Sequence, residues 1–261
     1  MSSLCEQIKT EYEQLQTLKE RLVFEYEKVK DTDDADGLSV VKKLQAEGES
    51  AYANLESKLY VSVERARELL GGENVLGPEE VEKTWGVRME KVPEILFSEA
   101  ELIECKDTHI LVAICPLSIL EIRDKVSGNQ SLFRERNRNW YNKESFAKVR
   151  GKIEWRLVRK TPVGNSTDKT WDKQQALLTK YEETPTAQVM VYAIIGHFLA
   201  TGERLFDNIY VRCSDVILRG CRVCVGFFGA DGLNVAVSSV DDNAVVSIGV
   251  SASRLPSDRH A

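Results

Sequence analysis

The sequence predicts an α+β protein in which an N-terminal helical hairpin or coiled coil precedes a domain that ends in β-strands. The first 70 or so residues carry apolar side chains at a helical period, whereas the last 50 or so carry short apolar runs separated by turns. The chain has 261 residues, of which 43% are hydrophobic and 8% aromatic. That length and composition suffice for a substantial hydrophobic core.

The N-terminal residues 1–72 predict two helices. Ile8, Leu15, Leu22 and Val29 recur every seven positions in residues 3–31, and Leu4 and Leu18 fill the intervening turns. An acidic, glycine-containing turn follows at residues 31–37. Residues 38–70 then resume the helical period, and Gly71-Gly72 ends it. We expect this segment to serve packing or the association of copies through residues 3–70, with docking of a partner helix as the alternative.

Residues 73–130 predict a connecting region of mixed helix and strand. Gly77-Pro78 and Ser98-Glu99 each have the chemistry of a helix start, with acidic residues in the first turn. The apolar run His109–Cys115 predicts a buried strand, which Pro116 closes.

Residues 131–261 predict a third region that becomes all-β toward its end. Lys152–Arg159 alternates apolar and charged residues, as a half-exposed strand does. Two helices are expected at 167–182 and 186–201, the second ending at Gly202. The strands expected after them are Ile209–Cys213, Cys221–Phe228, Leu233–Ser238 and Val245–Ser253.

The charge and hydropathy of the chain exclude several classes of partner. A net charge of -6 argues against a nucleic-acid backbone as the main partner, so Arg134-x-Arg136-x-Arg138-x-Trp140 is interpreted as a solvated loop leading into a core tryptophan. No apolar run approaches the roughly 20 residues of a membrane-spanning helix. The N-terminus lacks the basic and apolar regions of a secretory signal, so we expect a cytoplasmic protein, with export by another route left open.

The cysteines and histidines predict neither a metal site nor a catalytic one. Cys221-x-x-Cys224 is a single pair without a second pair or a suitably spaced histidine, as structural zinc would require. The pair falls within an expected strand, where its two side chains point to opposite faces, so redox chemistry is not expected either. His197 is expected to pack on an apolar helix. With no nucleophile-elbow, dinucleotide or Walker pattern present, we expect no catalytic residue and no cofactor.

The C-terminal tail is unusual in the residue types that it lacks. After Glu203 the chain contains no Lys, Glu, Gln, Met or Trp, although all five are present before it. Strands disfavour Lys and Glu, but this does not explain the loss of all five while Arg and Asp persist. Codons of the form NNY cannot encode these five residues. The gap therefore fits a segment whose codons were randomised from AAY templates.

The tail resembles the variable proteins of diversity-generating retroelements, whose C-terminal region has a C-type-lectin-like fold, and it is similar to the related formylglycine-generating-enzyme superfamily. The matching elements are Thr201–Arg212, Val223-x-Val225-Gly226-x-Phe228, Gly232-Leu233-x-Val235 and Gly249–Arg254. The likeness covers roughly the last sixty residues. It implies a C-type-lectin-like domain over 131–261, with a variable region at about 205–254.

The resemblance also implies a division between a constant frame and variable positions. The frame would be Val223, Val225, Gly226, Phe228, Gly232, Leu233, Val235, Gly249, Val250 and Arg254. The variable, ligand-binding positions would be Cys213, Asp215, Val216, Ile217, Cys221, Cys224, Phe227, Ala236, Val237, Val240 and Ala244. A rigid frame that presents interchangeable side chains would bind a protein or surface ligand, as a paratope does.

Three alternatives stay open. The same residues could be ordinary strand core. The protein could be a non-enzymatic structural or assembly protein that oligomerises through its N-terminal helices. It could also be a divergent formylglycine-generating-type enzyme, although the spacing of Cys221 and Cys224 does not match the active-site cysteines of that family, and kinship of fold alone does not carry an activity.

Overall fold

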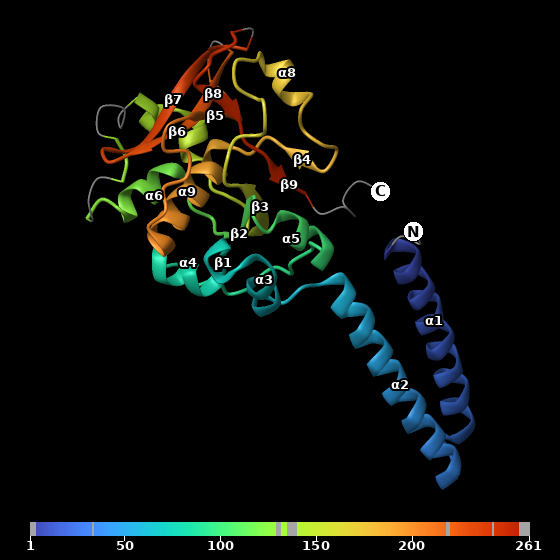
Figure 1. The fold of residues 1–261 in the computed structure, drawn as a ribbon. Helices are drawn as coiled ribbons and strands as arrows, with labels where there is room; N and C mark the ends of the chain where they lie inside the picture. Colours follow the sequence, from blue (N-terminus) through green and yellow to red (C-terminus); the bar gives the residue numbers. More distant parts are fainter. Residues whose placement is uncertain are drawn as a thin grey trace. The chain divides into compact units, whose positions relative to one another are not determined.

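The computed structural model describes residues 4–32, 34–128, 132–134, 140–217, 220–241 and 243–255. The chain forms two compact units, Met1–Val61 and Ser62–Ala261. The boundary therefore falls before residue 72, and residues 73–130 are not set apart from residues 131–261. The protein is α+β, with a helical hairpin in the first unit and helices and sheets mixed in the second (Figure 1).

The first unit consists of α1 (Leu4–Val29) and α2 (Ala35–Leu59), which pack against each other. Along α1 the half-buried or buried positions are 8, 11, 15, 16, 18, 22, 25 and 29, and along the described part of α2 they are 37, 41, 44, 48, 51 and 55. Apart from Gln16, these positions follow the alternating steps of three and four residues of a coiled-coil seam, as the sequence predicts. The chain reverses through the acidic turn, where the Asp34 carboxylate accepts hydrogen bonds from the backbone of Asp36 and Gly37.

The expected second helix, residues 38–70, is divided into two. After α2 the chain leaves the helical conformation, and a new helix, α3 (Val63–Leu70), begins at Ser62, whose hydroxyl accepts a hydrogen bond from Arg65 N at 3.1 Å. The helical period alone did not show this interruption, because Ala66 continues the pattern of α2 while being buried in the second unit. Gly71 ends α3 with a φ of 88°, as the glycine pair predicts.

The second unit contains six further helices among the described residues: α4 (Pro78–Trp85), α5 (Glu99–Cys105), α6 (Ile119–Lys125), α7 (Ser145–Lys148), α8 (Trp171–Gln175) and α9 (Ala187–Thr201). Short 3-10 turns lie at Gly72–Asn74 and Trp140–Lys143. The starts of α4 and α5 and the end of α9 at Gly202 agree with the sequence signals. None of the helices among the described residues is both long and apolar enough to cross a bilayer.

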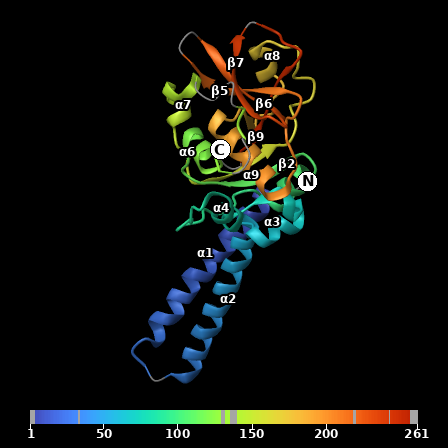
Figure 2. The same cartoon turned by 90° about the vertical axis from the view of Figure 1, so that its left-hand side faces the viewer.

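Two sheets complete the second unit. The five-stranded sheet has the order β1 (Val75–Leu76), β2 (His109–Ile114), β3 (Glu154–Arg159), β9 (Ser253–Arg254) and β4 (Glu182–Glu183). The four-stranded sheet has the order β7 (Gly232–Val240), β6 (Cys221–Gly229), β5 (Tyr210–Val216) and β8 (Ile248–Val250). The apolar helix α9 contacts β1 and β2 of the first sheet and β5 and β6 of the second, so it forms the centre of the core (Figure 1). Helices α6 and α7 pack together and against α9 (Figure 2).

Two sequence expectations in this unit are wrong. Only α8 forms within the helix expected at 167–182, because Gln174 is buried and its amide donates to the backbone of Ser166 and Ile248, which ties the segment to β8. The strand expected at Val245–Ser253 is divided into β8 and β9, which belong to different sheets. The apolar pattern continues through this crossing because Ser251 and Ala252 are buried between the two sheets.

The basic and aromatic loop is described only in part. Arg134 forms an ion pair with Asp231 at 2.8 Å, and the Trp140 indole donates to Val235 O at 2.9 Å. Arg136 and Arg138 lie outside the described residues. Arg134 therefore contacts the turn between β6 and β7, and Trp140 contacts β7.

Candidate functional site

The proposed frame of the C-terminal region lies almost entirely in the core. Nine of the ten frame residues are buried, and Arg254 is partly buried. Gly226 illustrates why a frame position tolerates only one residue: its φ is 150°, and a Cβ there would stand 2.0 Å from the carbonyl oxygen of Ile209. Such an approach requires glycine, because neither the conformation nor the space admits a side chain.

The residues between the frame positions differ in exposure. Val216, Val237 and Ala244 are exposed. Asp215, Ile217, Cys221, Phe227 and Ala236 are partly buried, and Cys213 and Cys224 are buried. The side chain of Val240 lies outside the described part of the chain. Most of the predicted ligand-binding positions therefore retain access to solvent, whereas the frame does not.

Pairing within the four-stranded sheet brings part of this set together at one end. Val216 pairs with Arg222 and Cys221 with Val240, and Ile217 N donates to Cys221 O at 2.9 Å. Phe227 lies at the other end of β6, where its ring is 4.6 Å from that of Tyr210. Val216, Ile217, Cys221 and Val240 thus lie together at one end of the sheet, and Phe227 is separate from them.

Cys213 and Cys224 are core residues and do not contribute to an exposed face. Desolvation raises the pKa of the Cys213 thiol well above its usual value and that of Cys224 to about 11. Both thiols therefore stay protonated at neutral pH. The prediction that Cys224 is an accessible ligand-binding position is wrong. The consecutive residues Val223, Cys224 and Val225 are all buried, which means that both faces of β6 are covered.

An arginine fixes the clustered end of the sheet. Arg222 makes a bidentate ion pair with Asp241 at 3.0 and 3.1 Å, and it donates to Ser214 O at 3.1 Å. Its guanidinium lies 3.5 Å from the ring centroid of Trp171. These contacts connect β5, β6 and the first residue of α8, so the exposed side chains project from a surface that several contacts hold in place.

A groove of 700 Å³ opens beside this end of the sheet. Trp171, Thr184 and Asp215 line it together with residues of the segment 146–156 and the start of α9. Asp215 accepts a hydrogen bond from Ala187 N, the first amide of α9, at 2.6 Å. That bond lowers the pKa of the Asp215 carboxyl, but burial has the larger effect and raises it.

The charges along the groove are largely paired. Arg156 forms ion pairs with Glu154 and Glu183, and Arg150 binds Glu121, which lowers the pKa of the Glu121 carboxyl to about 2. The remaining lining combines apolar residues such as Val149 and Val189 with polar side chains, of which Gln175 and Thr184 hydrogen-bond each other. The groove therefore offers both apolar contact and polar groups to a ligand.

Sequence reasoning identified only Asp215 among the residues that line this groove. Lys152, Trp171 and Thr186 come from segments far from the tail in sequence, and their residue types carry no motif. The pairing of Ser214 N with Pro185 O at 3.0 Å brings these segments together, and such a contact has no signal in one sequence.

The Cys221-x-x-Cys224 pair does not form a disulfide. Among the residues that the structure describes, no three His, Cys, Asp or Glu side chains gather where they could hold a metal ion. His197 is buried on α9, as expected, with its Nε2 2.7 Å from the Glu203 carboxylate.

Comparisons of the chain with protein-family models, with curated proteins and with solved structures found no match.

Proposed function

We propose that this protein binds a protein or surface ligand through a C-terminal face whose side chains are diversified by a retroelement, while the frame beneath them is kept. The observation that carries the proposal is that the strands with both frame and accessible positions lie in the part of the chain that lacks five residue types. Trp, Lys, Gln and Met last occur between Trp171 and Met190 and Glu last occurs at Glu203, and these strands begin at Tyr210. Burial of the frame and exposure of Val216, Val237 and Ala244 are what such a division of labour needs.

The proposal includes a C-type-lectin-like fold for residues 131–261. It is supported by the course of the tail, which supplies all four strands of one sheet and then returns through β9 to pair with β3 of the other. Asp215, near the end of β5, is bound to the first residue of α9 through the Ala187 amide, whereas Val216 and most of residues 243–247 are exposed. Side chains there can change with little effect on the core.

The binding face on this proposal is the clustered end of the sheet together with the adjoining groove. Asp215 belongs to both, because it lies in β5 next to Val216 and also lines the groove. Exposed apolar residues such as Val216 supply contact area, and the groove supplies hydrogen-bonding groups of constant identity. A ligand held in this way needs no chemical step.

The first experiment is made on the gene. We expect the codons of Cys213, Cys221 and Cys224 to end in a pyrimidine, and a near-identical template repeat to lie near a reverse-transcriptase gene, differing from this gene at adenines. Absence of the repeat, together with purine-ending cysteine codons, would remove the diversification from the proposal. An assembly protein built on the N-terminal helices would then be the better interpretation.

A second experiment tests the division of the tail in the protein itself. Val216→Asn and Val237→Asn change exposed side chains and should each alter the free energy of unfolding by less than about 0.5 kcal/mol. The matched frame variant Val225→Asn buries an amide in the core and should cost about 3 kcal/mol. Urea denaturation measures all three. Equal losses in all three variants would show that the tail is ordinary core.

A further inference from the structure

The helical hairpin has an open apolar groove of 420 Å³ between α1 and α2. Leu15, Leu18 and Leu22 form one wall, Leu44 belongs to the other, and Tyr12 and Tyr52 both contribute to the lining. The leucines are seam residues, so a closed coiled coil would cover all of them. Leu44 is buried here, but Leu15, Leu18 and Leu22 are only half-buried.

Gly48 is the reason that the seam stays open. It occupies a seam position on α2 where a leucine or valine would normally fill the space between the helices. A Cβ at Gly48 would meet no atom within 4 Å. The hairpin therefore leaves a hole in its own core, and two helices cannot close it from within.

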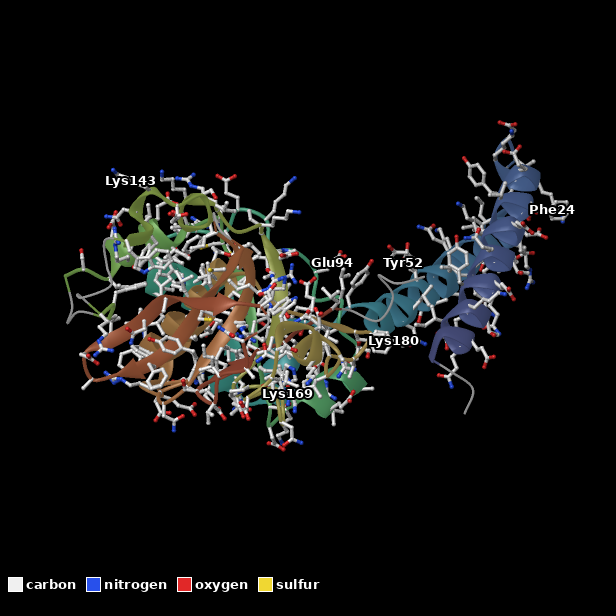
Figure 3. All side chains as sticks on the ribbon, turned by 90° about the horizontal axis from the view of Figure 1, so that it is seen from above. Phe24, Tyr52, Glu94, Lys143, Lys169 and Lys180 are labelled. Carbon is white, nitrogen blue, oxygen red and sulfur yellow. The ribbon has the colours of Figure 1, made fainter. Side chains whose placement is uncertain are left out.

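The exposed apolar side chains of the hairpin gather on the side of this groove. Tyr12, Val23 and Tyr26 follow a stripe along α1 with Gln16 and Lys19, and Leu38 and Tyr52 follow a stripe along α2 with Gln45 and Glu49. Phe24 and Val40 are the exposed large apolar residues on the opposite flank of the described helices. Phe24 and Tyr52 project outward from the hairpin in Figure 3.

The two stripes complement each other in register. The helices run antiparallel from Val29, which lies beside Gly37, so Tyr12 and Tyr52 stand at about the same level, and so do Gln16 and Glu49. A two-fold axis parallel to the helices preserves these levels and places α1 of one copy opposite α2 of the other. Tyr12 then faces the second copy's Tyr52, and Lys19 faces its Gln45 and Glu49. A two-fold axis across the helices would instead bring two Lys19 side chains together.

We propose that this face of the hairpin binds the same face of a second copy of the chain, forming a four-helix bundle about a two-fold axis parallel to the helices. The pairing closes the groove above Gly48, covers the leucines of both copies, and places Lys19 of each copy opposite Glu49 of the other. A 26-residue helix is about 39 Å long, and two helices side by side present a face about 20 Å wide. Each copy would therefore bury roughly 800 Å², as in a stable interface of standard size.

The inference is independent of the proposed function but has a consequence for it. A dimer carries two C-terminal faces, so binding to a repetitive surface gains from effective concentration without any new contact. The dimer would form equally if the C-terminal face bound nothing.

The test uses the full chain and compares two faces of the same hairpin by analytical ultracentrifugation. The groove-face variant is Tyr12→Glu with Tyr52→Glu, and the matched control on the opposite flank is Phe24→Glu with Val40→Glu. The substituted side chains have similar exposure, 53% and 57% against 61% and 43%. We expect the wild-type protein and the control to be dimers, and the groove-face variant to show a dissociation constant at least about 100-fold higher. Far-UV circular dichroism checks that the helices persist in both.

A charge exchange tests the direction of the axis. Lys19→Glu should weaken the dimer about tenfold, and adding Glu49→Lys should restore most of the affinity, because the two positions face each other between copies. A wild-type chain that is monomeric at 100 micromolar, about the highest practical concentration, overturns the proposal. A dimer that the control variant disrupts as strongly as the groove-face variant does also overturns it.

Discussion

The helical hairpin and the mixed unit that follows it bury their apolar side chains to different degrees. In the hairpin, Val29, Leu44 and Leu55 are the buried apolar residues among those described, and the rest of the seam is partly accessible. In the mixed unit, every residue of β2 is buried, and α9 is buried around nearly its whole circumference. The hairpin therefore leaves part of its apolar face accessible to solvent, whereas the mixed unit buries its apolar side chains within its own core.

Because of this difference in burial, a polar side chain contributes differently to stability in the two regions. On the hairpin, charged side chains lie in solvent, where pairs such as Lys28 with Glu25 add little to stability. Inside the mixed unit, a charged or polar side chain has to find partners within the core, and its removal leaves those partners without hydrogen bonds. Substitutions in the mixed unit should therefore have the larger effects.

The largest effect is expected at Arg212, which is completely buried on β5. Its guanidinium donates to Lys169 O at 3.0 Å, to Gln174 Oε1 at 2.9 Å and to Asn243 O at 2.6 Å. The substitution Arg212→Met keeps much of the volume but removes the donor of all three acceptors, of which the Gln174 amide oxygen is buried. We expect the free energy of unfolding to fall by about 4 kcal/mol, measured by urea denaturation.

The control for Arg212 is Arg222 on the adjacent strand β6. Arg222 also makes several contacts, but its partner Asp241 is partly exposed. Arg222→Met should cost only about 1 kcal/mol, since solvent replaces the lost ion pair. If the two variants lose equal stability, burial of the arginine and its partners does not determine the size of the loss.

The next effect is a pH dependence that originates in β2. His109 is 3% exposed, and its Nδ1 lies 2.7 Å from the Thr108 hydroxyl. Burial, with a smaller contribution from Arg159 and Arg254 opposed by Glu182 and Glu104, lowers the pKa of its imidazole from 6.5 to about 4. Between these values the unfolded chain binds the proton and the folded chain does not. Stability is therefore fully present above pH 6.5 and is lost as the pH falls toward 4, by up to about 3 kcal/mol.

The variant His109→Gln isolates this contribution. Urea denaturation at pH 6.5 and at pH 4 should show a smaller difference between the two conditions for the variant than for the wild-type protein. The Glu121 carboxyl, with a pKa of about 2, contributes stability that is lost only as the pH falls below its ordinary value of 4.5. An unchanged difference in the variant would mean that His109 becomes protonated without unfolding.

The two regions also differ in how far the sequence predicts them. The seam of the hairpin follows from the spacing of Ile8, Leu15 and Leu22, because one helical period decides both secondary structure and packing. The strands β2 and β6 follow from apolar runs with turns at their ends. The short helix α8 and the crossing between β8 and β9 do not, because they depend on Gln174 and Ser251 being buried by partners distant in sequence.

The candidate site shows the same limit. Alternation of frame and variable positions places Val216 and Val237 correctly on the surface, but it cannot show that both faces of β6 are covered and that Cys224 is therefore core. The groove beside Asp215 is assembled from segments about 30 to 70 residues apart in sequence. A single sequence shows local periods and residue types. Contacts between segments that are distant in sequence become visible only in the folded structure.

The smallest effect returns to the open hairpin and has the opposite sign. Gly48 lies in the interior of α2, where glycine costs conformational entropy on folding, and a Cβ there meets no atom within 4 Å. Gly48→Ala should therefore raise the stability of the hairpin by about 1 kcal/mol, which thermal unfolding followed by far-UV circular dichroism can detect. A loss of stability would mean that the space above Gly48 is already filled in solution, as a closely packed second copy would fill it. Together with ultracentrifugation, the change in stability caused by Gly48→Ala therefore shows whether a second copy fills the space above Gly48.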